Sequence, residues 1–128
     1  MIERIQFIEE LFKLGLPKNE YIICGSAWLA LLGVRKNNDL DLIVSTKLMD
    51  EKYGGIMPGV IQGTPFDIQG GHIPHPYSKM FGVKNNDDLV YNHRVYIDGY
   101  PFIPFKFYRE LKQLDISDEE CSRIAKVG

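Results

Sequence analysis

Hydrophobic residues recur at helical spacing near both ends of the chain. At the start they fall every three or four positions over residues 2–14, and Gly15 and Pro17 end the pattern. Late in the chain, Pro104 begins a second amphipathic helix that runs to about Leu114. Weaker patterns predict short helices over residues 26–32, 46–54 and 79–89, and a capping box at Ser117 and Glu120 predicts a last one.

Runs dominated by apolar residues predict the strands. Residues 21–24 and 40–44 are typical of buried strands, and residues 65–69 predict a third. Residues 94–103 contain an Asp-Gly turn and predict a hairpin, whereas the glycines and prolines of residues 54–64 predict irregular structure. This order lacks the regular alternation of a doubly wound sheet. It predicts an α+β fold in which helices flank a mixed β-sheet.

Composition narrows the class of protein. A chain of 128 residues, 45% hydrophobic, is expected to form one domain spanning residues 1–128. The net charge of −2 gives no long-range attraction to nucleic acid, so such binding would need a local basic patch. Two cysteines without a CxxC motif predict no disulfide framework. With no apolar run long enough to span a membrane and no signal-peptide pattern, the prediction is a cytoplasmic protein without membrane contact.

Polar residues interrupt the apolar pattern at the ends of the first two strands. The first strand runs into Gly25 and Ser26 at a helix start, where free N–H groups bind anions and glycine lets a phosphate approach. Asp39 and Asp41 are two positions apart on the second strand, so both side chains are expected on the same face. Two crowded carboxylates repel each other unless a cation lies between them. Mg²⁺ prefers such ligands and usually binds substrate phosphates as well.

A third carboxylate is available in the predicted strand at 65–69. Asp67 would complete the kind of site that holds two metal ions for in-line phosphoryl transfer. Each feature alone has an ordinary explanation, because Gly-Ser often follows a strand and Asp-Leu-Asp can be the polar side of a half-exposed strand. Their combination favours a site for a metal ion and a nucleotide.

The segment CGSAWLALLGVRKNNDLDLIV resembles the signature of the nucleotidyltransferase superfamily that includes DNA polymerase beta. It is similar in particular to the small nucleotidyltransferase-like proteins of abortive-infection and toxin–antitoxin systems. In that signature an apolar strand precedes Gly-Gly or Gly-Ser, and a helix, an arginine and Asp-x-Asp follow. The matching residues, in order, are Gly25, Ser26, Arg35, Asp39 and Asp41.

The resemblance implies Mg²⁺-dependent transfer of a nucleoside monophosphate from an NTP to a hydroxyl group of a small molecule, an RNA end or a protein. It assigns catalytic and Mg²⁺-binding roles to Asp39, Asp41 and Asp67, and nucleotide-binding roles to Gly25, Ser26, Arg35 and Lys112. No helical domain for an acceptor is evident within the 128 residues. A catalytically inactive binding module, such as an antitoxin-type protein partner, is therefore the alternative, and a domain unrelated to the family is a third.

Three further features have competing interpretations. His72 and His75 are more simply exposed loop residues than contacts to nucleotide or acceptor. Trp28 is more often a core residue than a platform for base stacking. The run Asn-Asn-Asp-Asp at 85–88 is most simply a solvated loop.

Overall fold

The computed structural model describes residues 2–113, and these residues build an α+β fold around one mixed sheet. Its six strands lie in the order β3-β4-β2-β1-β6-β5. Their bounds are β1 Tyr21–Cys24, β2 Leu40–Val44, β3 Gly59–Val60, β4 Phe66–Gly70, β5 Val95–Ile97 and β6 Tyr100–Phe102. Strands β2 and β4 are parallel, as are β1 and β6, whereas the other three neighbouring pairs are antiparallel. The predicted mixed sheet is confirmed.

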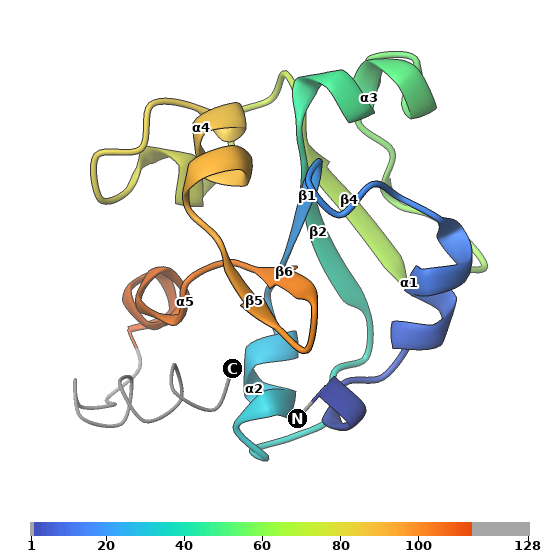
Figure 1. Ribbon diagram of the computed structural model, residues 1–128, viewed down its shortest axis with the longest axis vertical. Coiled ribbons are helices and arrows are strands. Elements are labelled where there is room, and N and C mark those ends of the chain that lie inside the picture. Colours follow the sequence, from blue (N-terminus) through green and yellow to red (C-terminus); the bar gives the residue numbers. More distant parts are fainter. Residues whose placement is uncertain (1, 114–128) are drawn as a thin grey trace.

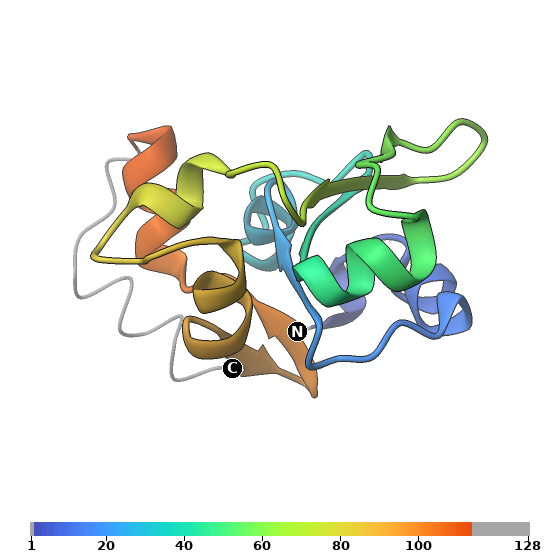
Figure 2. The same ribbon diagram turned by 90° about the horizontal axis from the view of Figure 1, so that it is seen from above.

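The helices lie on opposite sides of strand β1. Their bounds are α1 Ile8–Leu14, α2 Ala27–Leu31, α3 Thr46–Tyr53, α4 Asn86–Asn92 and α5 Phe105–Lys112, with 3-10 turns η1 at Ile2–Arg4 and η2 at Pro76–Lys79. Helices α4 and α5 lie to one side of β1, and α1 and α3 to the other (Figures 1 and 2). No helix within residues 2–113 combines the length and the apolar character needed to cross a membrane.

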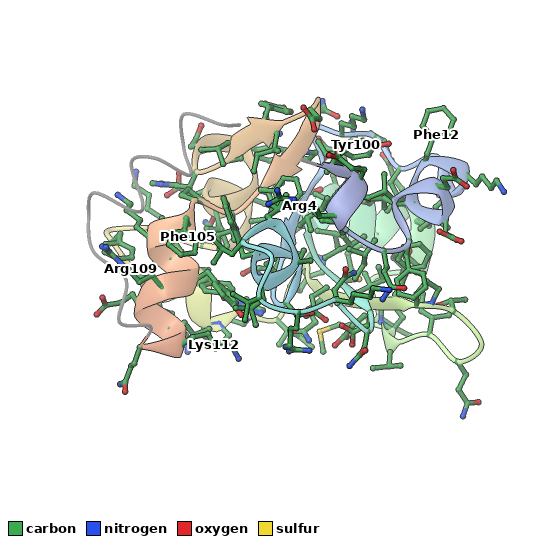
Figure 3. All side chains as sticks on the ribbon, turned by 90° about the horizontal axis from the view of Figure 1, so that it is seen from below. Arg4, Phe12, Tyr100, Phe105, Arg109 and Lys112 are labelled. Atoms are coloured by element: carbon green, nitrogen blue, oxygen red, sulfur yellow. The ribbon has the colours of Figure 1, made fainter. Side chains whose placement is uncertain are left out.

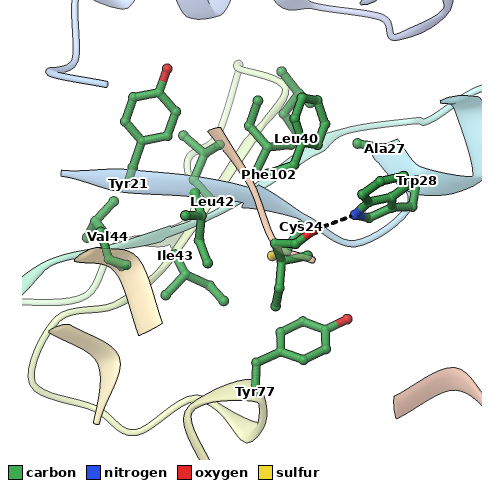
Figure 4. Packing of buried hydrophobic residues seen from close by; sticks show 14 of the residues in the cluster. Tyr21, Cys24, Ala27, Trp28, Leu40, Leu42, Ile43, Val44, Tyr77 and Phe102 are labelled. Carbon is green, nitrogen blue, oxygen red and sulfur yellow. Dashed lines mark hydrogen bonds between the residues drawn. The ribbon is translucent and has the colours of Figure 1, made fainter. Parts of the chain in front are cut away.

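The core explains why the two central strands have continuous apolar runs. Every residue of β1 is buried, and in β2 only Asp41 is partly exposed, because elements cover both faces of these strands. Trp28 packs against Phe102 and Phe105 and donates its indole N–H to the carbonyl of Ile103 at 2.9 Å (Figure 4). Trp28 is therefore a core residue, as predicted.

The predicted helix over residues 2–14 is divided in two. Phe7 adopts a left-handed backbone conformation (φ 75°), so η1 ends before α1 begins. The neighbouring Gln6 donates its backbone N–H to Asn37 Oδ1 at 2.8 Å and its side-chain amide to the Asn37 carbonyl at 2.7 Å. These contacts with a distant loop replace helical hydrogen bonds, which periodicity alone does not reveal.

Two loop predictions also need correction. The segment at 54–64 contains the short edge strand β3, paired with β4. Residues 85–88 begin helix α4 instead of forming a solvated loop, because Asn85 caps the helix and Asn86 is buried. The short helix predicted over 79–89 is therefore placed too early. The last helix predicted from Ser117 and Glu120 lies outside the described residues.

Candidate functional site

Three neighbouring strands bring Cys24, Asp41 and Asp67 into one row across the sheet. Cys24 is opposite Asp41 in the β1–β2 pair, and Asp41 is opposite Asp67 in the parallel β2–β4 pair. Directly opposed residues project from the same face of a sheet and contact one another. Residues 26 positions apart in the sequence thus place two carboxylates side by side.

Asp39 lies just before β2 and is positioned by Asn37. The Asn37 side chain is fully buried and donates from Nδ2 to the Asp39 carbonyl at 2.9 Å and to the Gln6 carbonyl at 3.1 Å. The peptide chain that carries Asp39 is therefore fixed to the N-terminal segment. Sequence analysis missed Asn37, since nothing in a polar turn indicates which of its residues is buried.

Gly25 allows the β1–α2 turn to approach Asp41 closely. Its φ is +70°, and a β-carbon at this position would collide with Asp41 Oδ2. Ser26 follows at the start of α2 but makes no side-chain capping bond, so its hydroxyl can serve a ligand. Helix α2 has only five residues, so its dipole is weak, and an anion here would depend mainly on cationic side chains.

Two adjoining cavities open beside this row of residues. The first, which we term the arginine cavity, measures about 270 Å³ and is lined by Gly25, Ser26, Arg35, Asp39, Asp41 and Lys112 among others. The second, the histidine cavity, measures about 170 Å³ and is lined by Asp41, Asp67, Gln69, His75, Tyr77 and Lys112 among others. Every predicted site residue lines one or both cavities. Larger cavities of about 380 and 530 Å³ contain none of the three aspartates, so charge and not size marks this site.

Lys112 reaches both cavities from the end of α5, where Figure 3 shows it near the last turn of the helix. Its positive charge lowers the pKa of Asp41 and so favours the ionised carboxylate. The sequence suggested Lys112 only through the family resemblance, because a lysine at the end of an amphipathic helix is ordinary.

The electrostatics of the site fit a cation. Burial, followed by the negative charges of Asp39 and Asp67, raises the pKa of Asp41 to about 6. A side-chain hydrogen bond between Asp41 and Asp67 makes a smaller contribution to the same rise in pKa. A carboxyl group in this condition gains from a positive ion, which removes the repulsion that otherwise favours its protonation. Burial raises the pKa of the adjacent Cys24 thiol, which disfavours the reactive thiolate form.

The carboxylates do not form a closed metal cage. Within residues 2–113, no three or more His, Cys, Asp or Glu side chains are grouped closely enough to hold a metal by themselves. Mg²⁺, however, is usually bound by one or two carboxylates together with waters and substrate phosphates. The open arrangement of Asp39, Asp41 and Asp67 fits an ion that binds together with a polyphosphate ligand.

His75 and Gln69 belong to the site, although sequence analysis did not place them there. Gln69 donates from Nε2 to Asp67 Oδ2 at 3.1 Å, and its position two residues along the strand could have indicated a shared face. His75 lines the histidine cavity, whereas His72 is exposed and contacts Asp50. The prediction of two exposed loop histidines is right for His72 and wrong for His75. The path of a loop decides this, and the sequence carries no signal for it.

Comparison of the chain with protein-family models, curated proteins and solved structures found no match. The resemblance to nucleotidyltransferases therefore stays a prediction from the residues themselves.

Proposed function

We propose that the protein is a Mg²⁺-dependent nucleotidyltransferase that moves a nucleoside monophosphate from an NTP to a hydroxyl acceptor. One observation supports this above all. Three carboxylates and two cationic side chains, drawn from separate elements, line two adjoining cavities beside a glycine turn that a side chain would obstruct. A structural domain gains nothing from keeping Asp41 beside two like charges.

The arginine cavity suits the triphosphate of the NTP. The Ser26 hydroxyl would donate to phosphate oxygens, and Gly25 would let them approach the backbone. Arg35 and Lys112 would offset the charge of the pyrophosphate that leaves. Asp39, Asp41 and Asp67 would hold Mg²⁺, which when bound would neutralise the triphosphate and polarise the α-phosphate.

The proposed transfer forms one bond, breaks one bond and moves one proton. The acceptor oxygen forms a bond to the α-phosphorus, the bond from the α-phosphorus to the bridging oxygen breaks, and pyrophosphate leaves with the electron pair. Asp67, which lines the histidine cavity, would take the proton of the acceptor hydroxyl.

Calorimetric titration tests this proposal. Each of the four NTPs is titrated into the wild type with and without Mg²⁺, and then into Asp39→Asn/Asp41→Asn. We expect Mg²⁺-dependent binding of at least one NTP, lost in the double variant and kept in the matched control Asp50→Asn, which changes an exposed aspartate outside both cavities. A folded wild-type protein that binds no NTP would contradict the proposal.

A catalytically inactive binding module is the second candidate, and one observation is compatible with it: within residues 2–113 the carboxylates are not grouped closely enough to hold a metal by themselves. Such a module would bind a protein partner without nucleotide. It predicts that a complex with that partner survives Asp39→Asn/Asp41→Asn, whereas an enzyme loses nucleotide binding in the same variant.

A further inference from the structure

His75 is held in one orientation by its own segment of chain. Its Nδ1 accepts a hydrogen bond from the backbone N–H of Tyr77 at 3.2 Å, and its ring stacks on the Tyr77 ring with centroids 5.0 Å apart. Tyr77 is buried and so gives a rigid support. One nitrogen and one face of the imidazole are therefore used by the protein.

The second ring nitrogen is left for a ligand. Because Nδ1 accepts a bond from an N–H group, the proton of a neutral imidazole is on Nε2. Among the described residues, Nε2 of His75 has no hydrogen-bond partner. Burial lowers the pKa of His75 to about 4, although the charge of Asp67 opposes this, so the ring is neutral near pH 7. His75, with Nε2–H as the remaining donor of its fixed ring, thus lines the same cavity as Asp67.

The two cavities differ in charge and in size. Of these two cavities, Arg35 lines only the arginine cavity, and among the described residues Lys112 is the one cation that lines the histidine cavity beside its two aspartates. Within residues 2–113, each cavity is lined by two aspartates, but the arginine cavity has two cations to offset them and the histidine cavity has one. A phosphate is therefore repelled more strongly in the histidine cavity, whereas an uncharged hydroxyl finds both a donor and an acceptor there. The volume of about 170 Å³ suits the reacting end of a molecule better than a whole nucleotide.

We propose that the histidine cavity is the acceptor site, that His75 Nε2 donates a hydrogen bond to the attacking oxygen, and that the acceptor is an uncharged hydroxyl with no adjacent phosphate. This inference rests on the proposed nucleotidyl transfer. The hydroxyl gives its proton to Asp67 while its oxygen, held by His75, attacks the α-phosphorus and displaces pyrophosphate. The N–H donor fixes the direction of the attacking oxygen and takes no part in the proton transfer.

Two substitutions at His75 distinguish the roles of its two ring nitrogens. Asn in His75→Asn keeps an oxygen that accepts the Tyr77 N–H but removes the distal donor. Gln in His75→Gln restores a distal amide donor. His72→Asn is the matched control, because His72 is exposed, contacts Asp50 and lies outside the histidine cavity.

The four proteins are given α-labelled NTP, Mg²⁺ and one of three acceptor probes: glycerol, N-acetylserinamide or a short oligoribonucleotide with a free 3′ hydroxyl. NTP binding is measured by calorimetry in parallel. We expect label to move to glycerol or to N-acetylserinamide in preference to the oligonucleotide, and the better probe distinguishes a polyol from a protein side chain. His75→Asn should lower kcat/KM for the acceptor by about 10-fold or more, with NTP affinity within about twofold of the wild type. His75→Gln should recover most of the loss, and His72→Asn should match the wild type.

The outcomes separate the two proposals. If the wild type binds no NTP, the proposed function fails. If NTP binding is normal but His75→Asn transfers as fast as the wild type, the role of His75 is wrong. Label that moves only to the oligonucleotide, or to no probe although NTP binds, overturns the assignment of the acceptor.

Discussion

At the scale of single residues, the absence of a side chain can matter as much as the contacts that a side chain makes. Gly25 shows this, because the carboxylate of Asp41 occupies the place where a side chain would begin. Gly25 and Asp41 both line the arginine cavity and the histidine cavity. A left-handed backbone conformation adds a second reason for glycine at this position.

Gly25→Ala is expected to destabilise the protein by about 2–4 kcal/mol, because a methyl group clashes with Asp41 and the backbone is left-handed. Gly33→Ala is the matched control, since Gly33 has a similar φ of +75° but no atom near the added carbon. It should cost about 1 kcal/mol, the strain of the backbone alone. Urea denaturation measures both. If the clash is the cause, adding Asp41→Ala to Gly25→Ala should bring the loss of stability closer to that of Gly33→Ala. Equal losses for Gly25→Ala and Gly33→Ala would contradict a clash with Asp41.

Asp41 makes the metal-free protein sensitive to pH. Its pKa of about 6 lies above the ordinary value of an aspartate, so the folded protein binds this proton more tightly than the unfolded chain does. Asp41 therefore contributes to the free energy of unfolding at low pH, and this contribution is lost as the pH rises from about 4 to about 6. Because solvent screens the partly exposed carboxylate, the loss is about 1 kcal/mol.

Asp41→Asn removes this loss. Above pH 7 and with a chelator present, the variant should be about 1 kcal/mol more stable than the wild type, and near pH 4 the two should be equal. Denaturation curves at a series of pH values give the difference. Glu51→Gln, which changes an exposed carboxylate on α3, should show no such dependence. A variant less stable than the wild type at pH 7 would show that Asp41 is not repelled in the folded state.

At the scale of elements, helix α4 organises the loop that carries His75. Asn86 is buried and donates from Nδ2 to the carbonyls of Gly71 and Ile73, while its Oδ1 accepts the backbone N–H of His75. Asp87 accepts two hydrogen bonds from Thr46 and ties the same helix to the start of α3. The loop is thus held at both ends by the first turn of one short helix.

Asn86→Ala should destabilise the protein by about 2–3 kcal/mol, because it leaves three backbone groups of the loop without partners. Asn92→Ala, in the same helix, removes only an exposed bond to Asp88 and should cost less than about 0.5 kcal/mol. Thermal or urea denaturation measures the difference. Asn86→Asp keeps the acceptor for His75 but places a carboxylate oxygen against the carbonyls of Gly71 and Ile73, so it should cost at least as much as Asn86→Ala. Equal effects of Asn86→Ala and Asn92→Ala would show that the loop does not depend on this contact.

At the scale of the whole molecule, the candidate site lies where separate parts of the chain meet. Its residues come from the β1–α2 turn, the loop before β2, strands β2 and β4, the loop before η2 and the end of α5. A ligand that contacts all of these parts binds only the folded protein. Its binding free energy is therefore added to the stability of the fold.

An NTP with Mg²⁺ at about 100 times its dissociation constant should stabilise the wild type by about 2.7 kcal/mol, which corresponds to a rise in Tm of about 10 °C. Removal of Mg²⁺ by a chelator should abolish the rise. The variant Asp39→Asn/Asp41→Asn should show none in either condition, and Asp50→Asn should behave as the wild type does. A rise that persists in the double variant would place the nucleotide elsewhere on the molecule.

Several elements were predictable because their signals are local. The apolar runs of β1 and β2, the Asp-Gly hairpin of β5 and β6 and the proline at the start of α5 depend on neighbours in the sequence. Tertiary contacts overrode local patterns elsewhere. The bonds between Gln6 and Asn37 divided the first helix, and burial of Asn86 converted a polar run into a helix start.

The sequence by itself determined which residue types the chain offers for phosphate and metal chemistry: the Gly-Ser turn, the Asp-Leu-Asp pair and a third aspartate in a strand. Only the tertiary structure decided that Asp41 and Asp67 are direct neighbours, that Lys112 reaches them, and that His75 and not His72 faces them. Strand pairing and loop paths are set by the free energy of the whole core, to which residues far apart in the sequence contribute together. The pattern of residues along one segment does not reveal these contributions from the rest of the core.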